Sequence, residues 1–493
     1  MTRPSPSAWA RPEPLPALGA TRQSSRTQWG KTRLAPPSAD GCSLPRLRAR
    51  DRSHFLHPFT NHRRMREQGT QVFVRGEGIH LIDANGRRYI DGMSGLWCVT
   101  LGYSQSEIVA AATAKLNELP FCSSFFGATH PAAIELADTI ASLTPTGLDQ
   151  VFFSNSGSEA NDTAIRAVRH YWELRAQPRR RVIISRHNAY HGSTYIGASL
   201  GGFACMHAQG GLPLPEIMHI RQPYHFAEGK GEAPEQFGLT AARALEEAIL
   251  RCGPDRVAAF IAEPIQAAGG VIIPPATYWP AIERIAQRYG VLVIADEVVC
   301  GFGRTGVWFG CQHQHFTPDV MTMSKGLTSG YAPLAATVLS HEIAEVIRDH
   351  DGEFEHGFTC SAHPVSCAVA NKTIEILHRE RVVETIRRET GPYLAMRLGN
   401  LGAHASVGEV RSVGLMAAIE LRRQDASSGN DTPAGLLGQT FRRLCADADL
   451  IVRAEGDTVM LAPPLISTRN DIDNIVARLD SVCRKLTRTA GRS

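Results

Sequence analysis

Helix-like and strand-like segments alternate from about residue 105 to residue 345, and this alternation limits the folds open to the chain. Apolar residues recur there at helical spacing, and short apolar runs of strand length separate the helical stretches. Such alternation is typical of α/β proteins, in which helices cover both faces of a mostly parallel sheet. The helical stretches are 106–119, 131–143 and 158–174, and the strand-like runs are 150–153, 181–185, 258–262 and 291–296.

The length of 493 residues predicts two or three domains rather than a single core. We expect a segment at 53–104 that joins the smaller domain, a large domain at 105–345, and a smaller C-terminal α+β domain at 346–493. Apolar runs around Gly76 and Gly78 predict a hairpin near the start of the first segment. Strand-like runs in the C-terminal region lie near Val410, at 416–421 and at 459–461.

Residues 1–52 differ from the rest of the chain in charge and composition. They contain ten basic and three acidic residues and show no apolar periodicity. A disordered basic extension is the favoured interpretation, because eight prolines before residue 46 would interrupt an amphipathic helix. An organelle transit peptide, with a similar Arg- and Ser-rich bias, stays open as the alternative, whereas the apolar stretch of a secretory signal is missing. We therefore expect order to begin near His54.

The bulk composition argues against several classes of protein. The net charge is +4, and since the extension carries about +7, the remainder carries about −3, unlike a nucleic-acid-binding surface. No run reaches the roughly 18 apolar residues of a membrane span. The eleven cysteines are dispersed, which predicts free thiols in a reducing compartment such as the cytoplasm. Cys311, His313 and His315 lie close together, but no second group with zinc-like spacing follows, so we expect no metal site.

Two charged residues follow buried strand-like runs. Asp296 ends the run 291–296, and ligands of open α/β sheets bind at the carboxyl ends of parallel strands. Lys325 follows a second short run that begins at Asp319, and a partly desolvated lysine can form a Schiff base. Each residue alone is a common feature of a strand end. Together they are the two protein groups that pyridoxal 5'-phosphate (PLP) requires, a carboxylate for its pyridinium nitrogen and an amine for its aldehyde.

Two further segments could hold such a cofactor. Ser156, Gly157 and Ser158 lie between a strand-like run and a helix, where backbone N–H groups and hydroxyls form an anion cup suited to a phosphate. An ordinary serine N-cap is the alternative. Tyr190 lies between polar residues, and its ring could stack on a flat cofactor or be buried for structural reasons.

Residues 301–306 match the G-x-G-x-x-G pattern of dinucleotide-binding folds. That pattern should open a helix directly after its strand. Here Glu297 and the three residues 298–300 intervene after the strand-like run, and the segment 307–310 is a poor helix start. We therefore do not expect a dinucleotide site.

Five separated segments, taken together, resemble the class III aminotransferases of PLP fold type I. Their order and spacing match that family, and the similarity runs from about residue 55 to residue 485. Three further segments resemble the subgroup of ω-amino acid or diamine:pyruvate aminotransferases. The five family segments are 156–162, 190–194, 263–266, 295–298 and 324–327, and the subgroup segments are 91–98, 274–280 and 301–306.

The resemblance implies a role for each matching residue. Lys325 would form the Schiff base and shuttle protons, and Asp296 would pair with the pyridinium nitrogen. Arg453 would be a mobile arginine that binds the acceptor carboxylate. The other matches assign Ser156, Gly157 and Ser158 to the phosphate, Tyr190 and Val298 to the faces of the cofactor ring, His191 and Glu263 to the cofactor surroundings, Thr359 to the phosphate of the neighbouring subunit's cofactor, and Trp97, Phe125 and Tyr190 to the substrate pocket.

The implied activity is a ping-pong transamination in a homodimer with shared active sites. An ω-amino acid or a diamine-type primary amine would give its amino group to a keto acid, expected to be pyruvate, with no nucleic acid or membrane as partner. Decarboxylation or racemisation on the same fold, and a non-catalytic homologue, are the alternatives. Arg453 favours transfer, and the intact Lys325 and Asp296 count against loss of catalysis. The chain departs from the subgroup at Cys360 and Ala362, where Tyr and Gly are usual, so the preferred amine stays open.

Overall fold

The computed structural model describes residues 43–422 and 434–490. The chain forms two compact units, one that ends at Thr70 and one that begins at Gln71. Most of the expected extension, residues 1–42, lies outside the described residues. Among the helices that the structure describes, none combines the length and the apolar character needed to cross a bilayer.

The first unit contains two short helices, α1 (Leu44–His54) and α2 (His62–Gln68). The prediction that order begins near His54 is therefore wrong, because α1 occupies the end of the expected extension. No side chain of α1 is buried. Polar contacts hold it instead, since the Thr70 hydroxyl donates to Asp51 Oδ2 at 2.5 Å. A helix without an apolar face leaves no periodicity in the sequence from which to predict it.

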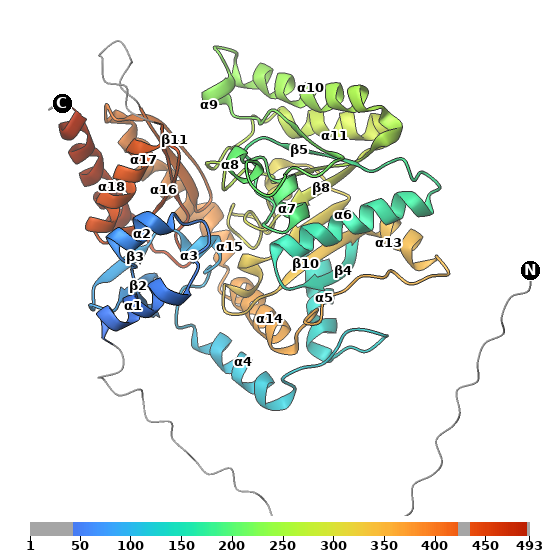
Figure 1. Ribbon diagram of the computed structural model, residues 1–493, viewed down its shortest axis with the longest axis horizontal. Coiled ribbons are helices and arrows are strands. Elements are labelled where there is room, and N and C mark those ends of the chain that lie inside the picture. Colours follow the sequence, from blue (N-terminus) through green and yellow to red (C-terminus); the bar gives the residue numbers. More distant parts are fainter. Residues whose placement is uncertain (1–42, 423–433, 491–493) are drawn as a thin grey trace, which may run out of the picture. The chain divides into compact units, whose positions relative to one another are not determined.

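A seven-stranded sheet forms the centre of the second unit (Figure 1). Its strands are β4 (Leu148–Ser154), β5 (Val182–Arg186), β6 (Ile217–Ile220), β7 (Val257–Ala262), β8 (Leu292–Asp296), β9 (Val320–Met323) and β10 (Ala335–Ser340). They lie in the order β4-β10-β9-β8-β7-β5-β6, and only β10 is antiparallel to its neighbours. The predicted α/β class with a mostly parallel central sheet is confirmed.

Apolar side chains cover both faces of this sheet. Ala259 and Ile261 of β7 pack with α6 (Gly157–Leu174) on one face. Phe260, which points the other way, packs with α10 (Pro234–Cys252) and α11 (Tyr278–Tyr289), and Figure 1 shows these two helices on the side of the sheet away from α6. The other helices of this region are α4 (Ser106–Glu118), α5 (Pro131–Leu143), α7 (Tyr195–Leu200), α8 (Ala204–His207), α9 (His225–Glu228), α12 (Gly310–Gln314) and α13 (His341–Arg348).

Two four-stranded sheets complete the second unit. One contains β1 (Phe73–Glu77), β2 (His80–Asp83), β3 (Arg88–Asp91) and β13 (Leu450–Ile451), and the other contains β11 (Val407–Val413), β12 (Met416–Leu421), β15 (Thr458–Leu461) and β14 (Arg453–Glu455). The predicted hairpin and C-terminal strands are confirmed. The remaining helices are α3 (Ser94–Trp97), α14 (Pro364–Arg379), α15 (Val382–Thr385), α16 (Gly391–Gly399), α17 (Leu436–Asp447) and α18 (Arg469–Ala490).

The parallel pairing of β13 with β3 joins the N-terminal strands to the C-terminal region, with Leu450 opposite Ile90. The expectation that 53–104 joins the smaller domain stays a prediction, because residues 53–70 belong to the first compact unit. The proposed boundaries at 105 and 346 fall inside the second compact unit and stay predictions.

Candidate active site

The carboxyl ends of the parallel strands β7, β8 and β9 meet at one edge of the central sheet. Glu263 follows β7, Asp296 ends β8, and Lys325 lies two residues beyond β9. The structure thus brings together, at the predicted edge, the carboxylate and the amine that the sequence singles out. Lys325 opens a single 3₁₀ turn with a backbone φ of +42°, a conformation that residues other than glycine seldom adopt.

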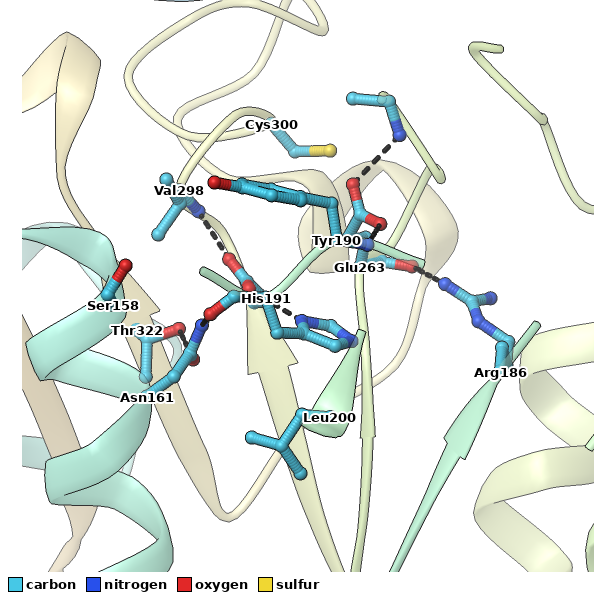
Figure 2. Close-up of polar contacts among 12 residues, drawn as sticks. Ser158, Asn161, Arg186, Tyr190, His191, Leu200, Glu263, Val298, Cys300 and Thr322 are labelled. Atoms are coloured by element: carbon cyan, nitrogen blue, oxygen red, sulfur yellow. Dashed lines mark hydrogen bonds and ion pairs between the residues drawn. The ribbon is translucent and has the colours of Figure 1, made fainter. Parts of the chain in front are cut away.

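Asp296 is buried among hydrogen-bond donors from Asn161, His191 and Val298, which Figure 2 labels. Its Oδ2 accepts from His191 Nδ1 at 2.7 Å and from Asn161 Nδ2 at 2.9 Å, and its Oδ1 accepts from the backbone N–H of Val298 at 3.0 Å. A carboxylate offers about four lone-pair positions. One position on Oδ1 is therefore left for a further donor, which suits the N–H of a pyridinium ring.

Asn161 and Thr322 belong to this site, although the sequence analysis assigned them no role. The Thr322 hydroxyl donates to Asn161 Oδ1 at 2.8 Å, which turns the amide so that Nδ2 faces Asp296. Both side chains are buried. A polar residue on the apolar face of α6, between Ala160 and Ala164, is the signal that could have revealed Asn161.

The amine of Lys325 forms no hydrogen bond or ion pair with any residue that the structure describes. Burial lowers the pKa of the Lys325 ammonium, and the positive charge of Arg453 lowers it further, while Asp296 and Glu263 oppose the shift. A lowered pKa increases the fraction of neutral amine, and only the neutral amine attacks an aldehyde. An unpartnered amine beside the Asp296 carboxylate fits the PLP aldehyde.

Glu263 holds the backbone that presents Tyr190. Its Oε1 accepts from the Tyr190 N–H at 3.2 Å, and its Oε2 accepts from the Ala267 N–H at 2.8 Å. Burial raises the pKa of the Glu263 carboxyl, and the His191 charge opposes the rise. Behind it lies Arg186, fully buried, whose Nη2 donates to the Glu263 carbonyl oxygen at 2.5 Å (Figure 2).

The first turn of α6 lies where the sequence predicts an anion cup. Ser156 is its N-cap, and the side-chain oxygen accepts from the Glu159 N–H at 3.2 Å. A Cβ at Gly157 would come 3.0 Å from a methyl group of Val298, so any larger residue would push against that side chain. Ser158 Oγ accepts from the Ser193 N–H at 3.1 Å, next to Tyr190 and His191. The cup therefore opens beside the residues that surround Asp296, as a cofactor with both a ring and a phosphate requires.

Two predicted substrate residues lie against each other. Arg453, on β14, places its guanidinium carbon 5.3 Å from the centre of the Trp97 ring. Its positive charge also lowers the pKa of Lys325. Its only ion pair among the described residues is a 3.5 Å contact with Glu455, and about a third of its side chain is exposed. Trp97 is buried on a tight turn that Arg304 anchors by donating to Ser94 Oγ at 3.1 Å.

Phe125 and Thr359 are not brought into this cluster by the described residues of the chain. Phe125 packs against Gly357, where a Cβ would come within 2.6 Å of the ring, and Thr359 is exposed two residues later. Phe125 lines an open hollow of about 1070 Å³, and Thr359 lies on the loop beside it. Ala362, where the resembling subgroup usually has Gly, has a φ of +53°, which accounts for the usual glycine.

The segment 301–306 forms turns and opens no helix, which agrees with the rejection of a dinucleotide site. The loop is held by the buried carboxylate of Glu297, which accepts from the N–H groups of Gly310 and Cys311, each at 2.7 Å. Burial raises the pKa of Glu297 to about 7. The glycines of this segment therefore serve the packing of a loop.

Comparisons with known proteins agree with this geometry. Residues 63–483 match the model of the family described as aminotransferase class-III. The chain is 49% identical over 428 residues to putrescine–pyruvate aminotransferase of Pseudomonas aeruginosa, covering 87% of this chain and 93% of the relative. It is 40% identical to the chloroplastic gamma aminobutyrate transaminase 3 of Solanum lycopersicum, with 86% and 82% covered.

Solved structures of transaminases share the fold. An (S)-enantioselective omega-transaminase from Thermomicrobium roseum superposes with a TM-score of 0.86 at 41% identity, covering 90% of this chain and 99% of the other. The omega transaminase of Pseudomonas jessenii in complex with PMP superposes with a TM-score of 0.88 at 40% identity and the same coverage. The chain belongs to the class III aminotransferases, the PLP-dependent enzymes of fold type I to which its sheet edge and its motifs point.

Proposed function

We propose that this aminotransferase takes its amino group from a diamine or an ω-amino acid and gives it to pyruvate in a ping-pong reaction. The relative named for putrescine and pyruvate supports this choice, because nearly half of its residues are identical to this chain over most of both lengths. The observation that carries the proposal is the place of Arg453, which lies over Trp97 with about a third of its side chain exposed and whose charge lowers the Lys325 pKa.

The residues that would hold PLP follow from the geometry of the site. Asp296 would accept from the pyridinium N–H, and the first turn of α6 with Ser158 would bind the phosphate. Tyr190 and Val298 would cover the two faces of the ring, with His191 and Glu263 fixing Asp296 and Tyr190. PLP, when bound, supplies an electron sink that stabilises negative charge on the substrate carbon.

Lys325 would serve first as the attachment point and then as the proton carrier. Once the substrate amine has displaced it, the neutral Nζ can accept the proton from the substrate Cα and later return it. Its lowered pKa suits both tasks, because a base of strongly raised pKa would stay protonated at neutral pH. Asp296, fixed by three donors, would keep the ring nitrogen protonated during this transfer.

Arg453 would resolve a conflict between the two substrates. A keto acid brings a carboxylate that a guanidinium binds with two parallel hydrogen bonds, whereas a diamine brings none. A guanidinium fixed in a dry pocket would be left unpaired, and would repel the ammonium, each time the amine bound. The single long contact with Glu455 leaves Arg453 able to turn toward water for the amine and back for pyruvate.

We further propose that two copies of the chain form the active unit. The family resemblance gives Thr359 to the partner's cofactor and Phe125 to the substrate pocket, and in this chain they lie on an exposed loop and hollow rather than among the residues around Lys325. A two-fold partner would bring them to its site, so that Thr359 reaches the partner's cofactor phosphate. The compartment that we propose is the cytoplasm, because the described cysteines are all free thiols.

A panel of amine donors tests the proposed substrates. Purified holoenzyme would be supplied with putrescine, β-alanine, γ-aminobutyrate and a benzylic amine, each with pyruvate or 2-oxoglutarate as acceptor. We expect alanine to form fastest from pyruvate with putrescine or an ω-amino acid. Turnover that prefers 2-oxoglutarate, or product formed without any keto acid, would contradict the proposal, and the second outcome would indicate decarboxylation or racemisation.

A further inference from the structure

His356 lies where the loop that carries Thr359 leaves the surface of α6. Its Nε2 is 2.8 Å from the hydroxyl oxygen of Thr163, and its Nδ1 is 3.0 Å from Arg166 Nη1. Arg166 also donates from Nη2 to the carbonyl oxygen of Glu355 at 2.7 Å. Two consecutive residues of the loop are thus bound to two side chains one turn apart on the same helix.

The partners of His356 permit only one protonation state. Thr163 donates its single hydroxyl proton to the carbonyl oxygen of Glu159 at 2.8 Å, so its oxygen must accept from His356 Nε2–H. Arg166 has no acceptor, so Nδ1 must be the unprotonated nitrogen. The imidazole is therefore neutral with its proton on Nε2. Burial, with the Arg166 charge beside it, lowers the pKa of His356 to about 4, in agreement with this assignment.

Aromatic packing fixes the ring in the same place. The His356 imidazole stacks on Phe152 of β4 with ring centres 5.2 Å apart and planes 10° apart. Phe354 and Phe358 pack edge-on against it, at 5.5 Å and 5.1 Å. His356 thus contacts a strand, a helix and its own loop, and both of its ring nitrogens are hydrogen-bonded. These contacts hold the loop in one position.

This anchor lies between the two parts of the proposed shared site. Toward the C-terminus, the anchored loop carries Thr359 and contacts the segment of Phe125, since Gly357 packs against Phe125 and the Ser124 hydroxyl donates to the Ser361 carbonyl oxygen at 3.0 Å. Toward the N-terminus of α6, the phosphate cup at Ser158 is five residues, or roughly 8 Å, along the same helix from Thr163.

We propose that His356 is a positioning residue that pins the loop carrying Thr359 to α6, so that the phosphate cup of one subunit and the loop it lends to its partner move as one body. This proposal rests on the proposed role of Thr359 in the partner's site. It predicts that loosening the anchor in one place weakens cofactor binding, although His356 touches no cofactor.

The test compares three variants of the holoenzyme. His356→Phe keeps the aromatic stack on Phe152 but removes both hydrogen bonds. Thr163→Val removes the acceptor from the helix side and keeps the shape of the side chain. His350→Phe, an exposed histidine of the same segment with no hydrogen bond to α6, is the matched control. Hydrogen–deuterium exchange would report on residues 353–361, and the rate of PLP release on dilution would be followed by absorbance.

We expect His356→Phe to speed exchange in 353–361 and to speed PLP release by at least the roughly 2- to 12-fold that one hydrogen bond is worth. Thr163→Val should do the same, the double variant should add little, and His350→Phe should behave as wild type. Unchanged exchange in His356→Phe, or fully additive effects of the two substitutions, would overturn the proposal.

A fourth variant, Thr359→Val, separates this proposal from the one on which it rests. If Thr359 binds a phosphate, Thr359→Val should release PLP faster than wild type. If Thr359→Val releases PLP faster but His356→Phe does not, the anchor is refuted while the shared site stands. If Thr359→Val releases PLP at the wild-type rate, the role of Thr359 is refuted, and the proposed link to the partner's site falls with it.

Discussion

The surroundings of Lys325 favour its neutral amine, the form that captures an aldehyde. Burial and the Arg453 charge lower its pKa, whereas an ordinary lysine titrates at about 10.4. The rate at which apoenzyme binds PLP covalently should therefore rise to its plateau below that pH. Stopped-flow absorbance of the lysine-linked cofactor, recorded from pH 6 to pH 11, measures the midpoint.

Two variants control this titration. Lys325→Ala should give no lysine-linked absorbance at any pH, even if PLP binds without a covalent bond. Arg453→Ala should move the midpoint upward, because it removes a charge that lowers the Lys325 pKa. A wild-type midpoint at or above the ordinary lysine value would refute the effect of burial.

Asp296→Asn should keep the fold and lose most of the activity. The amide nitrogen would meet groups that already donate, from Asn161 and from the Val298 backbone, and the negative charge opposite the ring nitrogen would be gone. Loss of a charge-assisted partner costs about 1.5–3 kcal/mol, or roughly ten- to more than a hundredfold in kcat. Asp319→Asn is the matched control, since Asp319 binds the Val293 N–H at the opposite end of β8. A near-normal kcat in Asp296→Asn would contradict the assignment.

Among single residues, the sequence predicts those whose role follows from their position directly after a strand. Asp296 and Lys325 are of that kind. Asn161 and Arg186 are not, because their importance arises from partners more than 70 positions away, which only the folded chain brings near. The tautomer of His356 is set in the same way by Thr163 and Arg166.

Strand β14 carries the residue that distinguishes the two half-reactions. Arg453→Ala should raise the KM for pyruvate by about ten- to a hundredfold, the value of a hydrogen-bonded charge, and should affect the half-reaction with putrescine far less. Single-turnover measurements of each half separate the two effects. Glu455→Ala, which removes the ion-pair partner but keeps the guanidinium, should leave the KM for pyruvate near its normal value. Equal damage to both halves in Arg453→Ala would mean a structural role.

Elements with a strong apolar pattern could be predicted to within one or two residues. Helix α5 and strand β12 have the predicted bounds, because each has a face in the core. Helix α1 was missed for the opposite reason, since it buries nothing. Strand β13 has only two residues and exists because β3 pairs with it, so its own sequence contains too little pattern to identify it.

A mixing experiment tests the shared active sites of the whole molecule. In a dimer of Lys325→Ala with Thr359→Val, one site has both defects and the other has neither, if Thr359 serves the partner. Subunit exchange between the two parents should therefore restore about a quarter of the wild-type activity at limiting PLP, where Thr359→Val holds its cofactor poorly, since half of the dimers are hybrid and each has one good site. Restoration that fails although sedimentation shows hybrid dimers would place Thr359 in its own subunit's site.

The pairing of Leu450 with Ile90 has a consequence for the order in which the protein is made. The ribosome releases β3 early, but β13, which pairs with it, emerges some 360 residues later, roughly 20 to 70 s at ordinary rates of synthesis. The turn that carries Trp97 waits equally long, because Ser94 Oγ donates to the Ala462 carbonyl oxygen and the Ala462 N–H to that of Gly92. The central sheet, complete at Ser340, can meanwhile assemble. A nascent chain would thus form the strands that present Asp296 and Lys325 well before the turn of Trp97, a proposed substrate residue, is in place.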